Sequence, residues 1–300
     1  MRVSIITPFY YGNEYITEYQ EMLLLNEKNL EAGDEIEVIL VNDSPSEAIR
    51  LQGTTSAKRN WRVISNERNM GIHASRIHGL LEAKGDYVIF LDQDDVLRED
   101  AVATFLSFVR CVAKQATAGY QVIVANAVLE QKDSTSLWYR TDYHKKQVGN
   151  LKTYINVGTQ IISPGQCLIP KELIPEYWMT HICTKNGSDD YFLWLLMLEE
   201  GIPFLYLDEP LYEHHFTDKN LSSSTEVTDE SNFQFISYMR EDGVIPVKDI
   251  DALEKMLVFK AEFRTANKMG KIKLAVSRMS LMLINIIFKL KSHTRYGFNR

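Results

Sequence analysis

The sequence predicts an α/β fold with a mainly parallel central sheet, flanking helices and a helical C-terminal extension. Over the first 130 residues, short apolar runs rich in β-branched residues alternate with segments of helical spacing. This alternation is typical of parallel strands joined by right-handed crossovers. From Asp249 to about Lys291 the pattern is helical. A chain of 300 residues with a 45% hydrophobic share can bury one large core or two small ones.

The first half predicts strands at 3–7, 36–42, 63–65, 86–92 and 121–126, with helices at 13–29, 72–84 and 100–116. Pro8 ends the first strand, and Gly85 ends the second helix. The run at 86–92 is apolar without alternation, which indicates a strand covered on both faces.

The second half has a looser pattern. Residues 130–185 predict short strands, a polar segment at 132–136 and a turn at 163–165. A helix is expected over 189–200, ended by Gly201, and a strand over 203–207, leading to Pro210. The polar segment 218–232 is predicted to be mobile.

Composition narrows the classes of function. The net charge of −7 argues against a general nucleic-acid binder. The three cysteines form no CxxC pair, so neither a zinc site nor a disulfide framework is indicated, and a reducing, cytoplasmic setting fits best. The N-terminus lacks the apolar core of a signal peptide and begins directly with a strand.

Carboxylates follow several predicted strands. Asp43 follows the second strand and Asp92-Gln93-Asp94-Asp95 follows the fourth, while Pro8 and Tyr10 follow the first. Ligands of open α/β sheets bind at the carboxyl ends of the strands. A diphosphate beside carboxylates requires a cation, so Mn²⁺ or Mg²⁺ is expected. The alternative is that Asp94 or Asp95 caps a helix near Leu97.

Several segments in order carry a resemblance to a known family. They are SIITPFYYGNEYI, VILVNDSPSE, NERNMGIHASRIHGLLEAKGDYVIFLDQDD, SPGQCLIP, NGSDDYFLWLLML and LYEHHFTDKNLSS. Over roughly residues 1–225 the chain resembles the family 2 glycosyltransferases of bacterial surface-polysaccharide synthesis, which are inverting enzymes with a GT-A fold. The resemblance implies a catalytic domain at 1–225, with a nucleotide-binding half at 1–125 and an acceptor half at 126–225, before a helical extension at 226–300.

The resemblance also implies roles on the donor side of the site. Asp92-Gln93-Asp94 resembles a DxD motif, in which Asp94 would bind the metal and Asp92 the ribose or sugar of the donor. Asp43 would bind the nucleotide base, for example uracil N3, although an Asx turn beside Ser44 is the alternative. The remaining donor-binding candidates are Pro8, Tyr10, Glu14, Asn69, Gly71, Arg76 and Gln93. The family often has Asn after the Arg, and here Ile77 stands there, so Arg76 as a solvated helix residue stays open.

Catalytic and acceptor roles are implied for the second half. An inverting transfer needs a base, and Asp190 is the candidate, with Asp189 as a helix cap or a residue that orients the acceptor. His215 is the second metal-ligand candidate, and Lys219 would pair with phosphate when the loop 218–224 closes. Gly165 and Gln166 would contact the sugar and acceptor. Trp138, Tyr139 and Trp178 form either an acceptor platform or part of the core.

The C-terminal tail differs in charge from the rest of the chain. Residues 257–300 contain ten Lys or Arg and one acid, a net +9, which leaves −16 for residues 1–256. The run MSLMLINIIFKL at 279–290 is too short to span a bilayer. We expect an interfacial helix on the inner face of the membrane. Packing on the catalytic domain or in a homodimer is the alternative.

The sequence therefore predicts transfer of a sugar from a nucleotide-diphosphate donor, such as a UDP-sugar, to a glycan or lipid-linked acceptor. Two alternatives stay open. A sugar nucleotidyltransferase shares the sheet and the metal but would need a Gly-rich, basic loop where this chain has PFYYGNE. A non-catalytic partner subunit could keep the fold, given Ile77 and Asp189.

Overall fold

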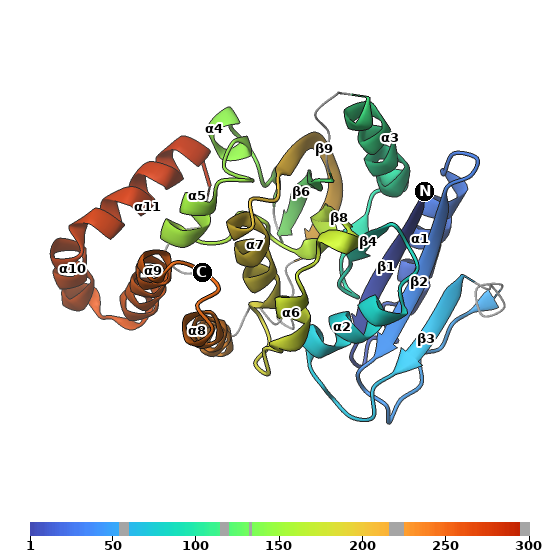
Figure 1. Cartoon of the computed structure of the whole chain (residues 1–300), viewed down its shortest axis with the longest axis horizontal. Helices are drawn as coiled ribbons and strands as arrows, with labels where there is room; N and C mark the ends of the chain where they lie inside the picture. The colour runs from blue at the N-terminus through green and yellow to red at the C-terminus, as the bar shows by residue number, and fades with distance from the viewer. Residues whose placement is uncertain (54–59, 115–119, 132–133, 216–224, 295–300) are drawn as a thin grey trace.

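The computed structural model describes residues 1–53, 60–114, 120–131, 134–215 and 225–294. Its centre is a nine-stranded sheet with the strand order β3-β2-β1-β4-β8-β6-β9-β5, and β7 pairs with β6 beside this path. Helices cover both faces of the sheet, and the C-terminal helices extend from one end of the molecule (Figure 1).

The nucleotide-binding half predicted from the sequence contains the parallel part of the sheet. Its strands are β1 (Arg2–Phe9), β2 (Glu35–Asn42), β3 (Trp61–Ser65) and β4 (Tyr87–Phe90), each parallel to its neighbour. Its helices are α1 (Ile16–Lys28), α2 (Ile72–Glu82) and α3 (Ala101–Ala113). The strand-helix alternation predicted for this half is present.

The second half contributes a mixed sheet. Its strands are β6 (Val122–Gln131), β7 (Ser134–Leu137), β8 (Cys167–Pro170) and β9 (Phe204–His215), and the short strand β5 (Val96–Leu97) of the first half pairs with β9. Only β6 and β9 run parallel here, while β8 is antiparallel to both β4 and β6. Its helices are α4 (Asp142–Lys145), α5 (Leu151–Asn156), α6 (Glu176–Thr180) and α7 (Asp189–Glu199).

Alternation along the strands builds a core on each face of the sheet. In β1, Val3 and Ile5 belong to one cluster, and Ile6 belongs to the other. The first cluster also contains residues of α1 and α3, and the second contains residues of α2 and α7. Because successive side chains of a strand point to opposite faces, a sheet covered on both sides buries nearly every residue of its strands, and most of these residues are apolar.

Two strands extend into segments for which the sequence does not predict a strand. The polar segment 132–136 contains the start of β7, which pairs with β6. The strand predicted at 203–207 continues through Pro210 to His215, with an irregularity in its pairing with β6 near Asn126. Strand pairing overrides local polarity in both cases, because the partner strand β6 supplies backbone hydrogen bonds along its length.

The C-terminal extension consists of α8 (Thr225–Glu241), α9 (Val247–Thr265), α10 (Lys268–Ser277) and α11 (Met279–Ser292). The mobile segment predicted at 218–232 is wrong for 225–232, which forms the first turns of α8; residues 218–224 lie outside the described residues. Phe235 and Met239 of α8 and Leu253 of α9 are buried in the core shared with α7. In contrast, α10 has no buried residue.

Candidate active site

A cleft of about 460 Å³ lies at the carboxyl ends of β1, β2 and β4. It brings together most of the site residues predicted from the sequence. The predicted residues that line it are Pro8, Tyr10, Glu14, Asp43, Asn69, Arg76, Asp92, Gln93, Asp94, Asp189 and Asp190. The strand ends and the start of α7 therefore meet at one cleft, as the switch point of an open α/β sheet requires.

A buried arginine links the two halves of the cleft. Arg76 Nη2 donates to Asp92 Oδ1 at 2.6 Å, and Arg76 Nη1 donates to Asp189 Oδ2 at 2.7 Å. The Arg76 side chain is only 4% exposed, so the alternative of a solvated helix residue is wrong. The planar guanidinium reaches two carboxylates in fixed directions, which orients Asp92 toward the second half.

Asp43 holds the turn that precedes α2. Its Oδ1 accepts hydrogen bonds from the backbone N–H of Met70 at 2.7 Å and from Asn66 Nδ2 at 2.8 Å, and its Oδ2 accepts from the N–H of Gly71 at 2.9 Å. Gly71 has a φ of +88°, a conformation that favours glycine. Asp43 lines the cleft, and its carboxylate already serves the turn that carries Asn69.

The turn after β1 is fixed by Gln93, the second residue of the DQDD stretch. Gln93 Oε1 accepts from the N–H of Tyr10 at 2.9 Å, and Gln93 Nε2 donates to the Tyr10 carbonyl at 3.3 Å. Tyr10 and Tyr11 are about half exposed, with ring centroids 4.7 Å apart. Two exposed aromatic rings at the mouth of a cleft suit stacking against a flat ligand such as a base.

Asp94 is the carboxylate most suited to a cation. Burial, together with the charges of Asp95 and Asp92, raises the pKa of Asp94 to about 7. Among the described residues, no basic side chain forms an ion pair with it. A carboxylate crowded by like charges is stabilised in its ionised form by a cation, so the residues present fit a divalent metal that is completed by phosphate oxygens.

Asp95 has a structural role. Its carboxylate accepts from the hydroxyl of Tyr212 and pairs with His214 Nδ1 at 3.1 Å. The helix-cap alternative for Asp94 and Asp95 is not what the structure shows, because β5 begins at Val96 and α3 begins only at Ala101. Asp95 instead attaches the DQDD stretch to β9.

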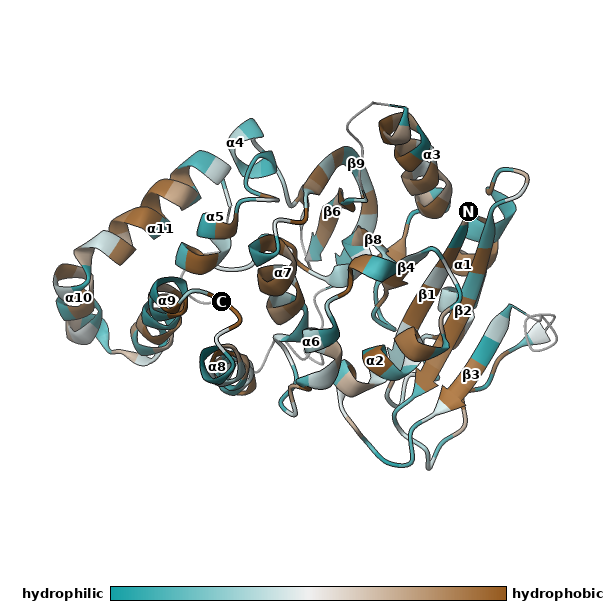
Figure 2. Cartoon of the chain, viewed as in Figure 1, coloured by the Kyte–Doolittle hydropathy of each residue, from teal (hydrophilic) through white to brown (hydrophobic). Residues whose placement is uncertain are grey.

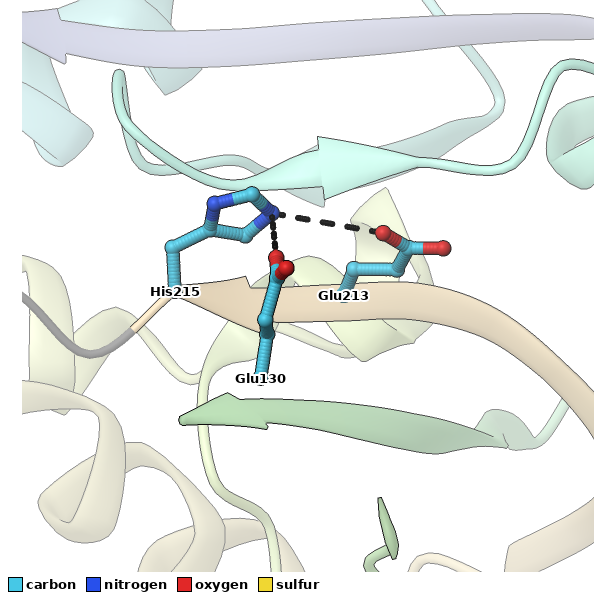
Figure 3. A group of neighbouring side chains, drawn as sticks. All are labelled: Glu130, Glu213 and His215. Carbon is cyan, nitrogen blue, oxygen red and sulfur yellow. Dashed lines mark ion pairs between the residues drawn. The ribbon is translucent and has the colours of Figure 1, made fainter. Parts of the chain in front are cut away.

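Neighbouring histidines of β9 point to different places. His214 lines the cleft. His215 Nε2 lies 3.3 Å from a Glu130 oxygen and 4.0 Å from a Glu213 oxygen, in a group that does not line the cleft (Figure 3). Within the described ranges, this group is the one set of three His, Cys, Asp or Glu side chains whose ligand atoms lie within 4.8 Å of one another. His215 therefore does not line the cleft that Asp94 lines, although its backbone N–H donates to Asp95 Oδ1 at 3.4 Å.

Asp190, the predicted base, lies at the start of α7. Burial raises the pKa of the Asp190 carboxyl to about 7, with the charge of Asp189 adding to the effect. Asp190 Oδ1 accepts from the N–H of Tyr191 at 2.7 Å. A half-buried carboxylate with this pKa is suited to general-base chemistry near neutral pH.

The predicted acceptor residues lie behind the cleft wall. Gly165 and Gln166 are buried, and the Gln166 amide binds the Ala125 carbonyl and the Ile162 N–H. Ser163 and Pro164 line the cleft beside them. Of the aromatic platform, Tyr139 and Trp178 belong to the core, and Trp138 is half-buried. Lys219 lies outside the described residues.

Sequence reasoning missed Asn186, which joins the two halves. Asn186 Oδ1 accepts from the N–H of Ile72, the first residue of α2, at 3.1 Å. No side chain within α2 supplies this cap. Asn186 lies in the motif NGSDD, three residues before Asp189. It caps a helix that begins more than a hundred residues earlier in the chain, and no local sequence pattern indicates such a contact.

Comparisons with known proteins identify the family of this chain. The sequence model described as "Glycosyl transferase family 2" matches residues 4–178. TuaG of Bacillus subtilis (strain 168), a glycosyltransferase named for teichuronic acid biosynthesis, is 27% identical over 226 residues, covering 74% of this chain and 82% of TuaG. An uncharacterized glycosyltransferase of Haemophilus influenzae is 24% identical over 246 residues, covering 82% of this chain and 78% of its own.

Solved structures share the fold. The crystal structure of Staphylococcus aureus TarS 1-349 in complex with UDP-GlcNAc has a TM-score of 0.59 at 16% identity, covering 97% of this chain and 82% of that one. The mannosyltransferase PcManGT of Pyrobaculum calidifontis, in complex with GDP-Man and Mn²⁺, has a TM-score of 0.54 at 14% identity, covering 96% and 80%. The chain therefore belongs to glycosyl transferase family 2 and is a glycosyltransferase with the GT-A fold.

Proposed function

We propose that this glycosyltransferase moves a sugar from a UDP-sugar to a glycan or lipid-linked acceptor, with inversion at the anomeric carbon. One observation carries the proposal: Asp94, suited to a cation, and Asp190, suited to a base, line the same cleft. The names of several relatives support this donor and acceptor chemistry. TarS is named a poly(ribitol-phosphate) β-N-acetylglucosaminyltransferase, and its solved structure contains UDP-GlcNAc.

The donor would lie along the nucleotide-binding half, residues 1–125. Tyr10 and Tyr11 would stack on the base, while Pro8, Glu14 and Asn69 would line the base and ribose pocket. Gly71 does not line the cleft and would act through the turn that carries Asn69. Asp43 keeps that turn in place through the backbone N–H groups of Met70 and Gly71. Arg76 would hold Asp92 toward the donor sugar.

The diphosphate would be held through a divalent cation that Asp94 binds. Bound Mn²⁺ or Mg²⁺ would stabilise the negative charge that develops on the departing diphosphate. Asp94 would offer its carboxylate to the cation, and Asp92 and Asp95 would add negative charge around it. Because His214 lines the cleft and His215 does not, His214 is the better candidate for a histidine near the diphosphate.

Asp190 would perform the proton transfer. The acceptor hydroxyl oxygen attacks the anomeric carbon, the bond between that carbon and the diphosphate oxygen breaks, and the hydroxyl proton passes to the Asp190 carboxylate. The nucleoside diphosphate leaves on the opposite side, which inverts the anomeric centre. Asp189 keeps its own carboxylate on Arg76 and thereby leaves Asp190 available for the acceptor.

The biological setting proposed is cell-surface polysaccharide synthesis. Relatives are named for teichuronic acid and minor teichoic acid biosynthesis. In this setting the catalytic domain, residues 1–225, would work at the inner face of the membrane, with the extension 226–300 in contact with it. Among the described residues, no helix combines the length and hydrophobicity that crossing a bilayer needs.

A screen of nucleotide sugars for donor hydrolysis, with and without Mn²⁺, tests the proposal. We expect metal-dependent hydrolysis of a UDP-sugar, lost in Asp94→Asn. UDP binding should be metal-dependent in the wild type. Hydrolysis that is equal with EDTA, or full activity of Asp94→Asn, would remove the cation and Asp94 from the proposal.

A further inference from the structure

A second cavity of about 260 Å³ adjoins the donor cleft. The two cavities share three lining residues, Ile162, Gly187 and Asp190. The proposed base therefore stands at the junction between them. If the donor fills the first cavity, the second is the adjoining space for an acceptor with a hydroxyl at Asp190.

The C-terminal extension builds one wall of this second cavity. Thr228 of α8, Leu257 and Lys260 of α9, and Phe288 and Lys289 of α11 line it. The opposite wall comes from the acceptor half, where the segment 157–162 and Trp138 face the helices. The cavity combines apolar surface, suited to the faces of sugar rings, with cationic side chains.

The cationic side chains are not all neutralised by protein carboxylates. Arg264 donates to both oxygens of Asp229, at 2.8 and 2.7 Å, so these two charges neutralise each other. Lys260 Nζ donates to the Val157 carbonyl at 2.6 Å, and no described carboxylate lies within 4 Å of it. The same absence within the described ranges holds for Lys289.

Within the part of the chain that the structure describes, Lys260 is therefore an ammonium group at a cavity wall without a carboxylate partner. Burial, and secondarily the charge of Arg264, lowers the pKa of the Lys260 ammonium to about 8. A charged group in a desolvated position is stabilised by an oppositely charged partner. The cavity offers space for that partner, and the protein does not supply it from the described residues.

We propose that this second cavity binds the acceptor, and that the acceptor carries an oxyanion, a phosphate or carboxylate, that pairs with Lys260 and Lys289. The inference rests on the proposed function, because it places an acceptor hydroxyl at Asp190. It assigns the C-terminal extension to acceptor selection. A neutral acceptor would leave Lys260 without a counter-ion and would bind more weakly.

Matched pairs of small probes test the oxyanion. The full chain is titrated with sn-glycerol 3-phosphate against glycerol, and with glucuronate against glucose, by ligand-observed NMR in the presence of UDP and Mn²⁺. We expect at least one anionic probe to bind about tenfold more tightly than its neutral counterpart. The glycerol 3-phosphate pair tests for a phosphate on the acceptor, and the glucuronate pair tests for a carboxylate.

Variants then locate the effect. Lys260→Met should abolish the preference for the anion, and Lys260→Arg should retain most of it. Lys255→Met is the matched control, since Lys255 is an exposed residue of the same helix α9. Equal binding of anionic and neutral probes to the wild type, or an equal loss in Lys255→Met, would overturn the inference.

A UDP titration of the same samples separates the two proposals. If Lys260→Met binds UDP like the wild type and has lost its anion preference, both stand. If UDP binds but no anion preference exists, only the inference about the acceptor fails. If UDP does not bind the wild type, the proposed function fails, while the probes still report on the second cavity. Thermal melting of each variant shows that it is folded.

Discussion

At the scale of single residues, the site depends on carboxylates whose surroundings differ. Asp189 is paired with a buried arginine, Asp190 is not, and Asp94 is crowded by other acids. The same residue type thereby takes three roles, because burial and neighbouring charge decide which carboxylate stays ionised and which holds a proton near neutral pH.

Asp190 should set the acid limb of the pH profile. A general base works only when it is deprotonated, and the pKa of this carboxyl is raised to about 7. We expect kcat/KM to fall as the pH drops through about 7, measured as transfer at saturating metal. Asp190→Asn should reduce kcat by about a hundredfold or more while UDP still binds. An unchanged profile in Asp190→Asn would exclude this residue as the base.

Arg76 should matter for stability as well as for the donor. Arg76→Met leaves the buried Asp189 carboxylate without its partner, which typically costs about 3–5 kcal/mol of unfolding free energy. Arg76→Lys should recover only part of it, since an ammonium cannot reach both Asp92 and Asp189 in the directions of a guanidinium. Urea unfolding measures both. A Lys variant as stable as the wild type would contradict the two-sided bridge.

At the scale of elements, α2 matters most for the site, because it carries Arg76 and begins beside the Asp43 turn. It packs closely on the sheet at Gly79, where a Cβ would lie 2.3 Å from Ile6 Cγ2 and 3.1 Å from Val41 Cγ2. The absence of a side chain at Gly79 sets how near the helix lies to β1 and β2, and hence where Arg76 points.

Gly79→Ala therefore tests the position of α2. We expect it to destabilise the fold by about 1–2 kcal/mol, because overpacking outweighs the better helix propensity of alanine. Leu81→Ala, at an exposed position of the same helix, should be nearly neutral. Denaturant titration reports both. Stabilisation by Gly79→Ala would mean that the core around Ile6 rearranges without cost.

At the scale of the whole molecule, the extension has two kinds of helix. Helices α8 and α9 share the core with α7, whereas α10 and α11 leave large apolar side chains exposed. Figure 2 shows hydrophobic residues as brown segments of α11. The exposed apolar side chains are Met269, Ile272, Val276, Met279, Leu283, Ile284, Ile286, Ile287 and Leu290. Lysines at 268, 271, 273, 289 and 291 lie among them. An apolar face rimmed by lysine suits an anionic lipid surface.

Sedimentation with lipid vesicles tests this surface. We expect the chain to sediment with phosphatidylglycerol vesicles, more weakly at high salt, and little with phosphatidylcholine vesicles. The double variant Ile287→Glu and Leu290→Glu should stay in solution, while Leu81→Glu on α2 should behave like the wild type. If the wild type instead forms a dimer that the double variant abolishes, this face is an interface between two copies.

The sequence by itself determined the α/β class, the strands of the first half and the carboxylates at their ends. Those features are local: an apolar run marks a strand, and the residue after it lies at the strand's carboxyl end. This suffices to bring Asp43, Asp92 and Asp94 to one cleft, whereas Asp190 is indicated by the resemblance to the family. The family resemblance added the roles that the spacing alone does not assign.

Only the tertiary structure decided which partner each side chain takes. Arg76 meets Asp189 across 113 positions, and no local pattern encodes that pairing. His214 lines the cleft and His215 does not, because β9 continues past Pro210 and alternate residues of a strand face opposite sides. The second cavity exists because α8, α9 and α11 fold back on the acceptor half, which the sequence presents only as a basic, helical tail.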